Sequence, residues 1–289
     1  MNKQKLASQS LILATAIAAS SALAGHHSNK HVGDDVVDKQ RAALAKNTEG
    51  KGFGPQSPRD IDMAKGNNKR LFSKAPKHSE MNLCNIHFHV GSEHKGGEFT
   101  KHAGNGDGKG HNTGYVYAGK LSPKETKDFG KPVCAGKGHS LKSGDTLELH
   151  YVHSTAQVTP GPTLGACLSD SLKNPQLRVE TQVYVAVNDD KAKDFVELTA
   201  HGMKNGYHQA LNIPSNTGTP ITYAGSTTGP SYNEQGSPLQ VTWNVRPEVV
   251  KVSIASVAKW CEGNTFNEDH GHGVRNLVTN PDLLSQIEK

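Results

Sequence analysis

Short apolar runs, separated by Gly, Pro, Asn and Ser, fill the chain from Asn82 onward and limit the fold more than any other feature. Runs bounded in this way predict β-strands joined by long connections. Helical periodicity is convincing only at Lys191–Met203 and Ile254–Cys261, with shorter stretches at Val36–Ala45 and Pro281–Ile287. We therefore expect a mainly β domain with peripheral helices. The predicted strands are Leu83–Val90, Tyr115–Ala118, Thr146–His153, Leu177–Val187, Ile221–Ala224, Leu239–Val245 and Val249–Ser253.

The first residues of the chain have the layout of a cleaved export signal. Two lysines precede an uncharged apolar stretch that ends in Ala-Leu-Ala at residue 24. The stretch is shorter than the ~20 residues of a membrane-spanning helix. We expect residues 1–24 to be a signal peptide, 25–76 an extended amino-terminal arm and 77–289 a single domain. The mature protein is then periplasmic or secreted and has no membrane attachment.

The charge pattern gives no support for a nucleic-acid partner. Loss of Lys3 and Lys5 with the signal takes the basic count from 32 to 30, against 27 acidic residues. The lysines are scattered and have few aromatic neighbours on which bases could stack. The sequence gives no indication of the oligomeric state.

Four cysteines, Cys84, Cys134, Cys167 and Cys261, are widely spaced and contain no Cys-x-x-Cys pair. In an oxidising compartment they can form two disulfides. Spacing alone does not choose among the three possible pairings. The pairing that we prefer joins Cys134 to Cys167 and Cys84 to Cys261.

Two histidine-bearing strands carry the chemistry of this sequence. In Asn85-Ile-His-Phe-His-Val90, His87 and His89 point to one face of a strand because side chains alternate with a period of two. In Leu147-Glu-Leu-His-Tyr-Val-His153, the same parity places Glu148, His150 and Val152 together. If the two strands are neighbours, His87, His89 and His150 converge and leave a fourth tetrahedral position open, as in catalytic zinc sites.

Other histidines favour an ordinary structural interpretation, because the chain contains 16 of them. His153 lies on the opposite face from His150 and is expected to be structural. Phe88 and Leu149 are expected to be core residues. Several more histidines lie in polar loops, namely His26, His27, His102, His111, His270 and His272.

A histidine that binds metal usually donates its second ring N–H to an oxygen acceptor, which fixes its tautomer. Glu148 is the candidate acceptor for His150, and Asn85 is a weaker candidate near His87. These two residues are therefore expected to support the metal ligands rather than bind the metal themselves.

At these residues the chain resembles a known family. Asn85-Ile-His-Phe-His-Val-Gly-Ser-Glu-His94 together with Glu148-Leu-His-Tyr-Val-His-Ser154 is similar to the δ-class carbonic anhydrases and, more distantly, to the α-class. Tyr223-Ala-Gly-Ser-Thr-Thr-Gly-Pro230 resembles the α-class segment Tyr-x-Gly-Ser-Leu-Thr-Thr-Pro-Pro, and Val241-Thr-Trp-Asn-Val245 resembles the strand that follows it. The resemblance runs from about Asn82 to Cys261 and is dense at these four motifs.

The resemblance implies an α-carbonic-anhydrase-like, largely antiparallel twisted sheet and a Zn²⁺ ion held by His87, His89 and His150. Cobalt or cadmium stays open as the metal. In such an enzyme a zinc-bound hydroxide hydrates carbon dioxide reversibly to bicarbonate and a proton. Domain 77–289 would then be the catalytic domain.

The resemblance also implies roles for residues around the metal. Thr228 would accept a hydrogen bond from the hydroxide and donate its own proton to Glu93. Val152 and Trp243 would form the apolar substrate pocket, and Glu148 would be the carboxylate behind the ligands. Gly229 replaces the second threonine of the α-class segment, and an alternative alignment makes Thr227 the residue that accepts this hydrogen bond.

Proton removal needs a group that titrates near neutrality at the mouth of the cavity. His94, His78 and a loop histidine are the alternatives, and direct exchange with buffer is another. Two other functions compete with carbon dioxide hydration: a zinc-dependent esterase on the same site, and an exported zinc-binding protein. The dispersed histidines, together with Thr228 and Glu93, favour catalysis over storage.

Overall fold

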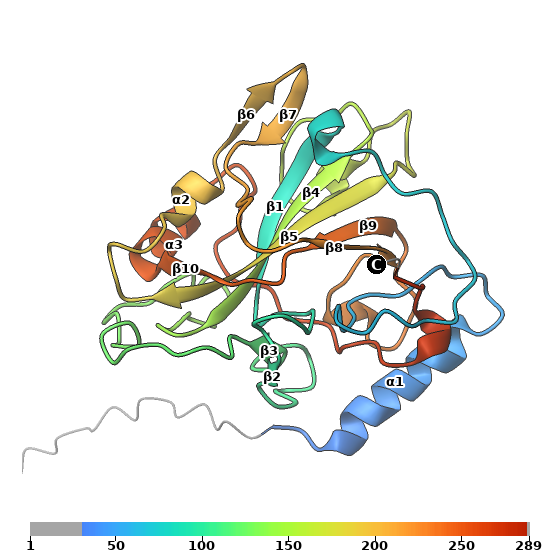
Figure 1. The fold of residues 1–289 in the computed structure, drawn as a ribbon, viewed down its shortest axis with the longest axis horizontal. Helices are drawn as coiled ribbons and strands as arrows, with labels where there is room; N and C mark the ends of the chain where they lie inside the picture. The colour runs from blue at the N-terminus through green and yellow to red at the C-terminus, as the bar shows by residue number, and fades with distance from the viewer. Residues whose placement is uncertain (1–30, 288–289) are drawn as a thin grey trace, which may run out of the picture.

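A mixed, twisted sheet of six strands forms the centre of the computed structural model, which describes residues 31–287 (Figure 1). The sheet contains β1 (Asn82–Val90), β4 (Thr146–Ser154), β5 (Leu177–Val187), β8 (Ile221–Ser226), β9 (Gln240–Val245) and β10 (Val250–Ser253). The strand order is β1-β4-β5-β9-β8, and β10 also pairs with β5. β5 runs parallel to β9 and β10, and the other pairs are antiparallel. The expected mainly β fold with a largely antiparallel sheet is confirmed.

Smaller elements surround the sheet. Two strand pairs lie apart from it, β2 (Lys101–His102) with β3 (Tyr115–Val116), and β6 (His201–Lys204) with β7 (Tyr207–Ala210). The helices are α1 (Asp34–Thr48), α2 (Phe195–Leu198) and α3 (Ile254–Cys261). Single 3₁₀ turns are η1 (His78–Glu80), η2 (Leu164–Cys167), η3 (Pro230–Tyr232) and η4 (Pro281–Leu283). In Figure 1, α2 and α3 lie together beside β10, and the β6–β7 hairpin projects from the top of the view.

The helix predicted over Lys191–Met203 is wrong. Only α2 is helical there, and it begins where the Asp194 side chain accepts hydrogen bonds from the amides of residues 196 and 197. The chain then turns at Asn205 and Gly206, which have φ angles of 53° and 83°. An Asn-Gly pair with both φ values positive makes a tight hairpin turn. This turn produces the β6–β7 hairpin in place of further helix.

Apolar side chains cover both faces of the sheet. On one face, Phe88 and Leu149 pack in a core with Phe195 of α2 and Trp260 of α3, as expected for these strand residues. On the other face, a second apolar cluster surrounds Trp243. His87, His89 and His150 share this second face with Trp243, so the sheet itself separates the main core from the site.

The two disulfides correct the expected pairing. Cys84 bonds to Cys167, and Cys134 bonds to Cys261. The reason is spatial: η2, which ends at Cys167, packs on β1, where Cys84 lies. Sequence spacing carries no information about this packing.

The arm expected over residues 25–76 contacts the domain closely in its second half. Ser57 and Arg59 are fully buried. Arg59 Nη1 donates to the carbonyl of Ser285, and Ser57 Oγ hydrogen-bonds the hydroxyl of Tyr223 on β8. The signal peptide predicted at residues 1–24 lies outside the described residues.

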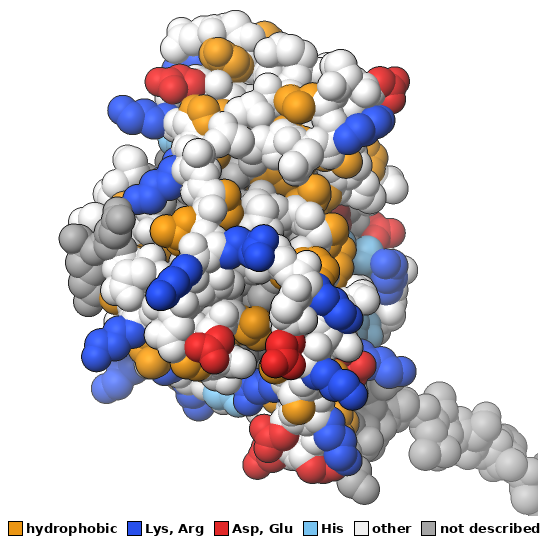
Figure 2. Space-filling model, turned by 90° about the vertical axis from the view of Figure 1, so that its right-hand side faces the viewer, with side chains coloured by type: hydrophobic (Ala, Val, Ile, Leu, Met, Phe, Trp, Pro, Cys, Tyr) orange, Lys and Arg blue, Asp and Glu red, His pale blue; other side chains and the backbone are white. Residues whose placement is uncertain are grey.

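The surface shows no segregation of charge in the view of Figure 2. Lysine and arginine side chains are dispersed over that face among acidic and apolar side chains. Within residues 31–287, none of the helices combines the length and the apolar character that crossing a membrane requires.

Candidate metal site

The register between β1 and β4 places three histidines at one point of the sheet. His87 lies directly opposite His150 in the antiparallel pair, and His89 lies opposite Glu148. The ring centroids are 5.3 Å apart for His87 and His89, 5.0 Å for His87 and His150, and 4.8 Å for His89 and His150. The two strands are therefore neighbours, as the convergence of these side chains requires.

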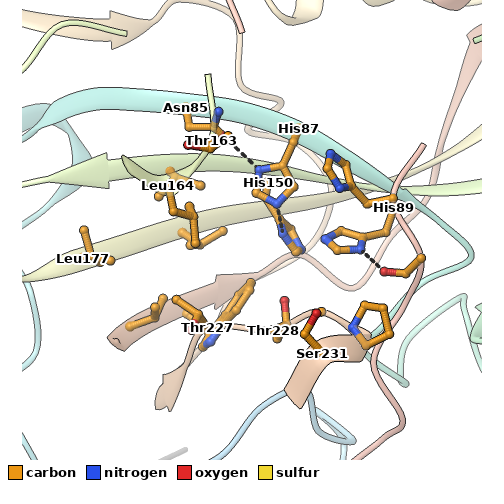
Figure 3. Close-up of a pocket in the computed structure, with 18 of the residues that line it drawn as sticks. Asn85, His87, His89, His150, Thr163, Leu164, Leu177, Thr227, Thr228 and Ser231 are labelled. Atoms are coloured by element: carbon orange, nitrogen blue, oxygen red, sulfur yellow. Dashed lines mark hydrogen bonds between the residues drawn. The ribbon is translucent and has the colours of Figure 1, made fainter. Parts of the chain in front are cut away.

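Oxygen acceptors fix the orientation of the two β1 rings. His87 Nδ1 donates to the side-chain oxygen of Asn85 at 2.6 Å. His89 Nδ1 donates to the carbonyl of Gly273 at 2.9 Å, a bond visible in Figure 3. Because Nδ1 carries the proton in both rings, the lone pair of each ring is on Nε2. The expected contact between Asn85 and His87 is thus present.

The His150 ring is held in the other tautomer, with the proton on Nε2. Its Nε2 donates to Glu148 Oε1 at 2.7 Å, which leaves the lone pair on Nδ1. That Nδ1 lies 3.3 Å from His87 Nε2. Two nitrogens bound to zinc at ~2.0–2.1 Å with a tetrahedral angle are about 3.4 Å apart. The buried Nε2 of His89 has no hydrogen-bond partner. Three lone pairs thus converge on one point, which fits a metal cation.

Burial keeps the rings of His87 and His89 neutral. The pKa of His89 is lowered to about 4, chiefly by burial, with the neighbouring histidines adding to the effect. The pKa of His87 is lowered well below its usual value, first by burial and then by the proximity of His150. Neutral imidazole is the form that binds metals, so both rings are ready to act as ligands at neutral pH.

Glu148 anchors a buried chain of hydrogen bonds behind the ligands. Besides the bond from His150, Glu148 Oε1 accepts one from Nδ1 of His94 at 2.7 Å. His94 Nε2 in turn bonds the hydroxyl of Tyr223 at 2.8 Å. Burial raises the pKa of Glu148, but His94 and the other donors hold it well below its usual value. Glu148 is therefore an ionised support for the His150 ring.

The group formed by His94, Glu148 and His150 is neither a second metal site nor a route for protons. The ligand atoms of His94, Glu148 and His150 also lie within 4.8 Å of one another. However, ring N–H groups of both histidines already donate to Glu148 Oε1, so these three residues form a support rather than a metal site. His94 is fully buried, with both ring nitrogens engaged. It therefore cannot carry protons at the cavity mouth, which removes one of the alternatives drawn from the sequence.

A cavity of about 350 Å³ opens in front of the three histidines. Thr227, Thr228 and Ser231 lie across it from the histidines (Figure 3). Val152 and Trp243, the two residues expected in the substrate pocket, both line it. The rest of the apolar wall consists of Leu164, Leu177, Val179 and Val241.

Glu93 lies beside the site rather than in the cavity. Its Oε1 accepts a hydrogen bond of 2.6 Å from the backbone N–H of Arg275. Its buried Oε2 has no hydrogen-bond partner and lies 3.6 Å from His89 Nε2. The hydroxyl of Thr227 is likewise buried and unpaired. The structure thus brings Glu93 next to the ligands and both threonines into the cavity.

Two ionisable residues of the cavity, His272 and Glu268, were missed by sequence reasoning. His272, expected in a polar loop, lines the cavity with Glu268, and its ring centroid is 5.4 Å from that of His87. The backbone of His272 pairs with β1 through hydrogen bonds to Phe88 and Val90. The alternation of Glu268, His270 and His272 is a period-two pattern that could have indicated a strand-like segment.

The fold and the site together define a mainly β protein with a candidate three-histidine metal centre at the base of a partly apolar cavity. The sequence model of the delta carbonic anhydrases matches residues 78–256, more than half of the chain. The chain therefore belongs to the delta carbonic anhydrase family and is a carbonic anhydrase, a lyase that acts on carbon dioxide.

Comparison with solved structures adds distant likenesses. One is a hyperthermostable carbonic anhydrase from an active hydrothermal vent chimney, with 14% identity, coverage of 80% of this chain and 89% of the other, and a TM-score of 0.32. Another is the α-carbonic anhydrase of Thermovibrio ammonificans in complex with the inhibitor sulfanilamide. It has 17% identity, the match covers 83% of this chain and 88% of the other, and the TM-score is 0.29. A third is the α-carbonic anhydrase of Photobacterium profundum. It has 18% identity, the match covers 86% of this chain and 96% of the other, and the TM-score is 0.27. No curated protein matches the chain.

Proposed function

We propose that this carbonic anhydrase hydrates carbon dioxide to bicarbonate and a proton with Zn²⁺ held by His87, His89 and His150. The observation that carries this proposal is the convergence of three imidazole lone pairs at the base of the cavity. Three neutral nitrogen ligands with a free fourth position suit catalytic zinc. Bound there, zinc supplies Lewis acidity that lowers the pKa of water to about 7, a value established for carbonic anhydrase in general rather than obtained from this structure.

The residues of the chain contribute orientation and charge. Asn85 and Glu148 keep the ligand rings in the metal-binding tautomer. Thr228 accepts a hydrogen bond from the attacking oxygen and donates a hydrogen bond from its own hydroxyl to Glu93, so that a lone pair of the attacking oxygen points at the substrate. The support for Glu93 as acceptor is its buried, unpaired Oε2 beside the ligands. Thr227, with its own unpaired hydroxyl, stays the alternative to Thr228.

The cavity favours carbon dioxide over an ester. Val152, Trp243 and the other apolar side chains on one wall provide an environment for a small apolar molecule with no charge. A zinc-dependent esterase would need room for a larger polar substrate. A storage protein would need neither the apolar wall nor a pair of hydroxyl groups facing the ligands.

Proton release has fewer candidates than the sequence suggested. His94 is buried, and His78 is half-exposed beside Glu180, outside the lining of the cavity. The proton therefore leaves the cavity through a loop histidine or by direct exchange with buffer. We also propose export of the mature protein and a catalytic domain over residues 77–289, and the two disulfides support an oxidising location.

Metal removal tests the proposal. Dialysis against a zinc chelator should abolish the hydration of carbon dioxide, and one equivalent of Zn²⁺ should restore it. Parallel addition of Co²⁺ and Cd²⁺ would show which metals support the reaction. Hydration that persists in the metal-free protein would contradict the proposal, as would a zinc-loaded protein that cleaves an ester but does not hydrate carbon dioxide.

A further inference from the structure

A row of histidine rings continues outward from the metal ligands, and the proposed reaction does not use it. The ring centroid of His272 lies 5.4 Å from that of His87 and 5.7 Å from that of His89. The next ring, that of His270, lies 5.1 Å beyond His272. The spacing of these rings matches the spacing within the ligand cluster itself.

A stacked pair of histidines lies near the outer end of the row. His111 and His139 have ring centroids 4.1 Å apart and an interplanar angle of 8°. His139 is exposed and His111 is half-buried. The backbone of Ala135, four residues before His139, forms an antiparallel bridge with His270, so the stacked pair belongs to a segment that lies against the row. The pKa of His111 is lowered by burial first and then by His139.

Carboxylates orient the two middle rings as they do in metal-binding histidines. His270 Nδ1 donates to Asp269 at 2.6 Å, which leaves the lone pair on Nε2. His272 Nε2 donates to Glu268 at 2.7 Å, which leaves the lone pair on Nδ1. A carboxylate that fixes the tautomer and raises the basicity of the ring is the usual partner of a metal ligand.

The outer rings do not form a finished site. Among the described residues, sets of three ligand atoms within 4.8 Å of one another occur only at His87, His89 and His150 and in the group around Glu148. One or two imidazoles hold a divalent cation weakly, so an ion bound by the outer rings can leave again. Such a row suits transfer better than storage.

We propose that His139, His111, His270 and His272 form a loading path that captures divalent transition-metal ions at the surface and passes them to the three-histidine site. This path rests on the metal site of the proposed function. The two carboxylates beside the middle rings add negative charge that attracts a cation toward the cavity. The path ends at His272, whose ring shares the cavity with the three ligands.

The rate of metal uptake tests the path. Metal-free full-length protein is mixed rapidly with Co²⁺, and the visible absorption of the bound ion is followed with time. His272→Gln and His270→Gln should each lower the second-order rate constant roughly tenfold, and the double variant should lower it further. The final spectrum, the stoichiometry and the rate of loss to excess chelator should match those of the wild type. His201→Gln, at a histidine that bonds Thr265 outside the row, is the matched control.

Equal uptake rates in the variants and the control would overturn the inference. An altered final spectrum or faster metal loss in His272→Gln, with unchanged uptake, would also overturn it, because His272 would then be a permanent ligand. Failure of the proposed function is separate: it would appear as fully loaded wild-type protein that does not hydrate carbon dioxide, whatever its uptake rate.

Discussion

At the scale of single residues, the proposed metal site depends on the groups that hold the three histidine rings. Asn85→Ala and Glu148→Gln should each weaken metal binding by roughly 10–100-fold. The first removes the acceptor of the His87 ring, and the second removes the negative charge of the acceptor of the His150 ring. Competition with a chromophoric chelator measures the change. Asn188→Ala, which alters an amide bonded to backbone carbonyls elsewhere on the surface, should leave the affinity unchanged. Wild-type affinity in both ligand-support variants would show that the rings need no support.

Substitution of the two threonines separates the alternatives in the cavity. Thr228→Val should lower kcat/KM roughly 100-fold with the metal retained, because the attacking oxygen loses its orientation. Thr227→Val should have a much smaller effect. Steady-state hydration rates and metal content of both variants decide the question. A larger loss of kcat/KM in Thr227→Val than in Thr228→Val would show that Thr227 is the residue that orients the attacking oxygen.

The convergence of His87, His89 and His150 could be predicted from residue patterns, and the physical reason is the fixed period of a strand. The alternation of side chains along a strand placed His87 and His89 on one face of the first strand, and His150 and Val152 on one face of the second. Parity could not show the tautomers, which depend on acceptors such as the Gly273 carbonyl, far away in sequence. It could not place His272 either, because a loop that pairs with β1 has no local signature of that contact.

At the scale of secondary structure, long strands were predictable and short elements were not. The predicted bounds of β5 and α3 agree with the structure because each has a continuous apolar pattern of one period. The β6–β7 hairpin was missed because its strands are too short for periodicity, and the Asn205-Gly206 turn was the only local signal. The disulfides depend on how η2 and α3 pack, which no local pattern contains.

A buried ion pair links β5 to β9 and the residues that follow it. Glu180 accepts hydrogen bonds from Asn244 at 2.6 Å and from Arg246 at 3.0 Å, and Glu180 and Arg246 are both buried. Glu180→Gln should lower the free energy of unfolding by about 3 kcal/mol, because Arg246 is left buried without its partner charge. Urea denaturation measures the loss. Asp170→Asn, at an exposed ion pair, should change little, and an equally small effect at Glu180 would show that the buried pair contributes no more than a surface one.

At the scale of the whole molecule, stability should fall in acid for two reasons. Burial lowers the pKa of His153 to about 3, below the ~6.5 of the unfolded chain. The unfolded state therefore binds more protons between these values, and stability is lost as the pH falls through this window. Burial raises the pKa of Glu180, but His78, Asn244 and Arg246 bring it to about 2, so its contribution is present above pH ~4.5 and is lost below it.

Urea denaturation of the metal-free protein between pH 7.5 and pH 5 isolates the histidine contribution. His153→Gln should flatten part of the decline in this range, because one buried ring that resists protonation is gone while His87 and His89 remain. The dependence below pH 4.5 should stay, because Glu180 is unchanged. An identical slope in wild type and His153→Gln would show that His153 does not contribute.

Hydration of carbon dioxide by the purified mature protein, measured by stopped flow beside His150→Ala with metal content determined on both, tests the central claim most directly. We expect fast hydration with one equivalent of zinc in the wild type, and loss of both in His150→Ala. A wild-type protein that binds zinc yet hydrates carbon dioxide no faster than buffer would contradict the claim, as would a His150→Ala variant that keeps its activity.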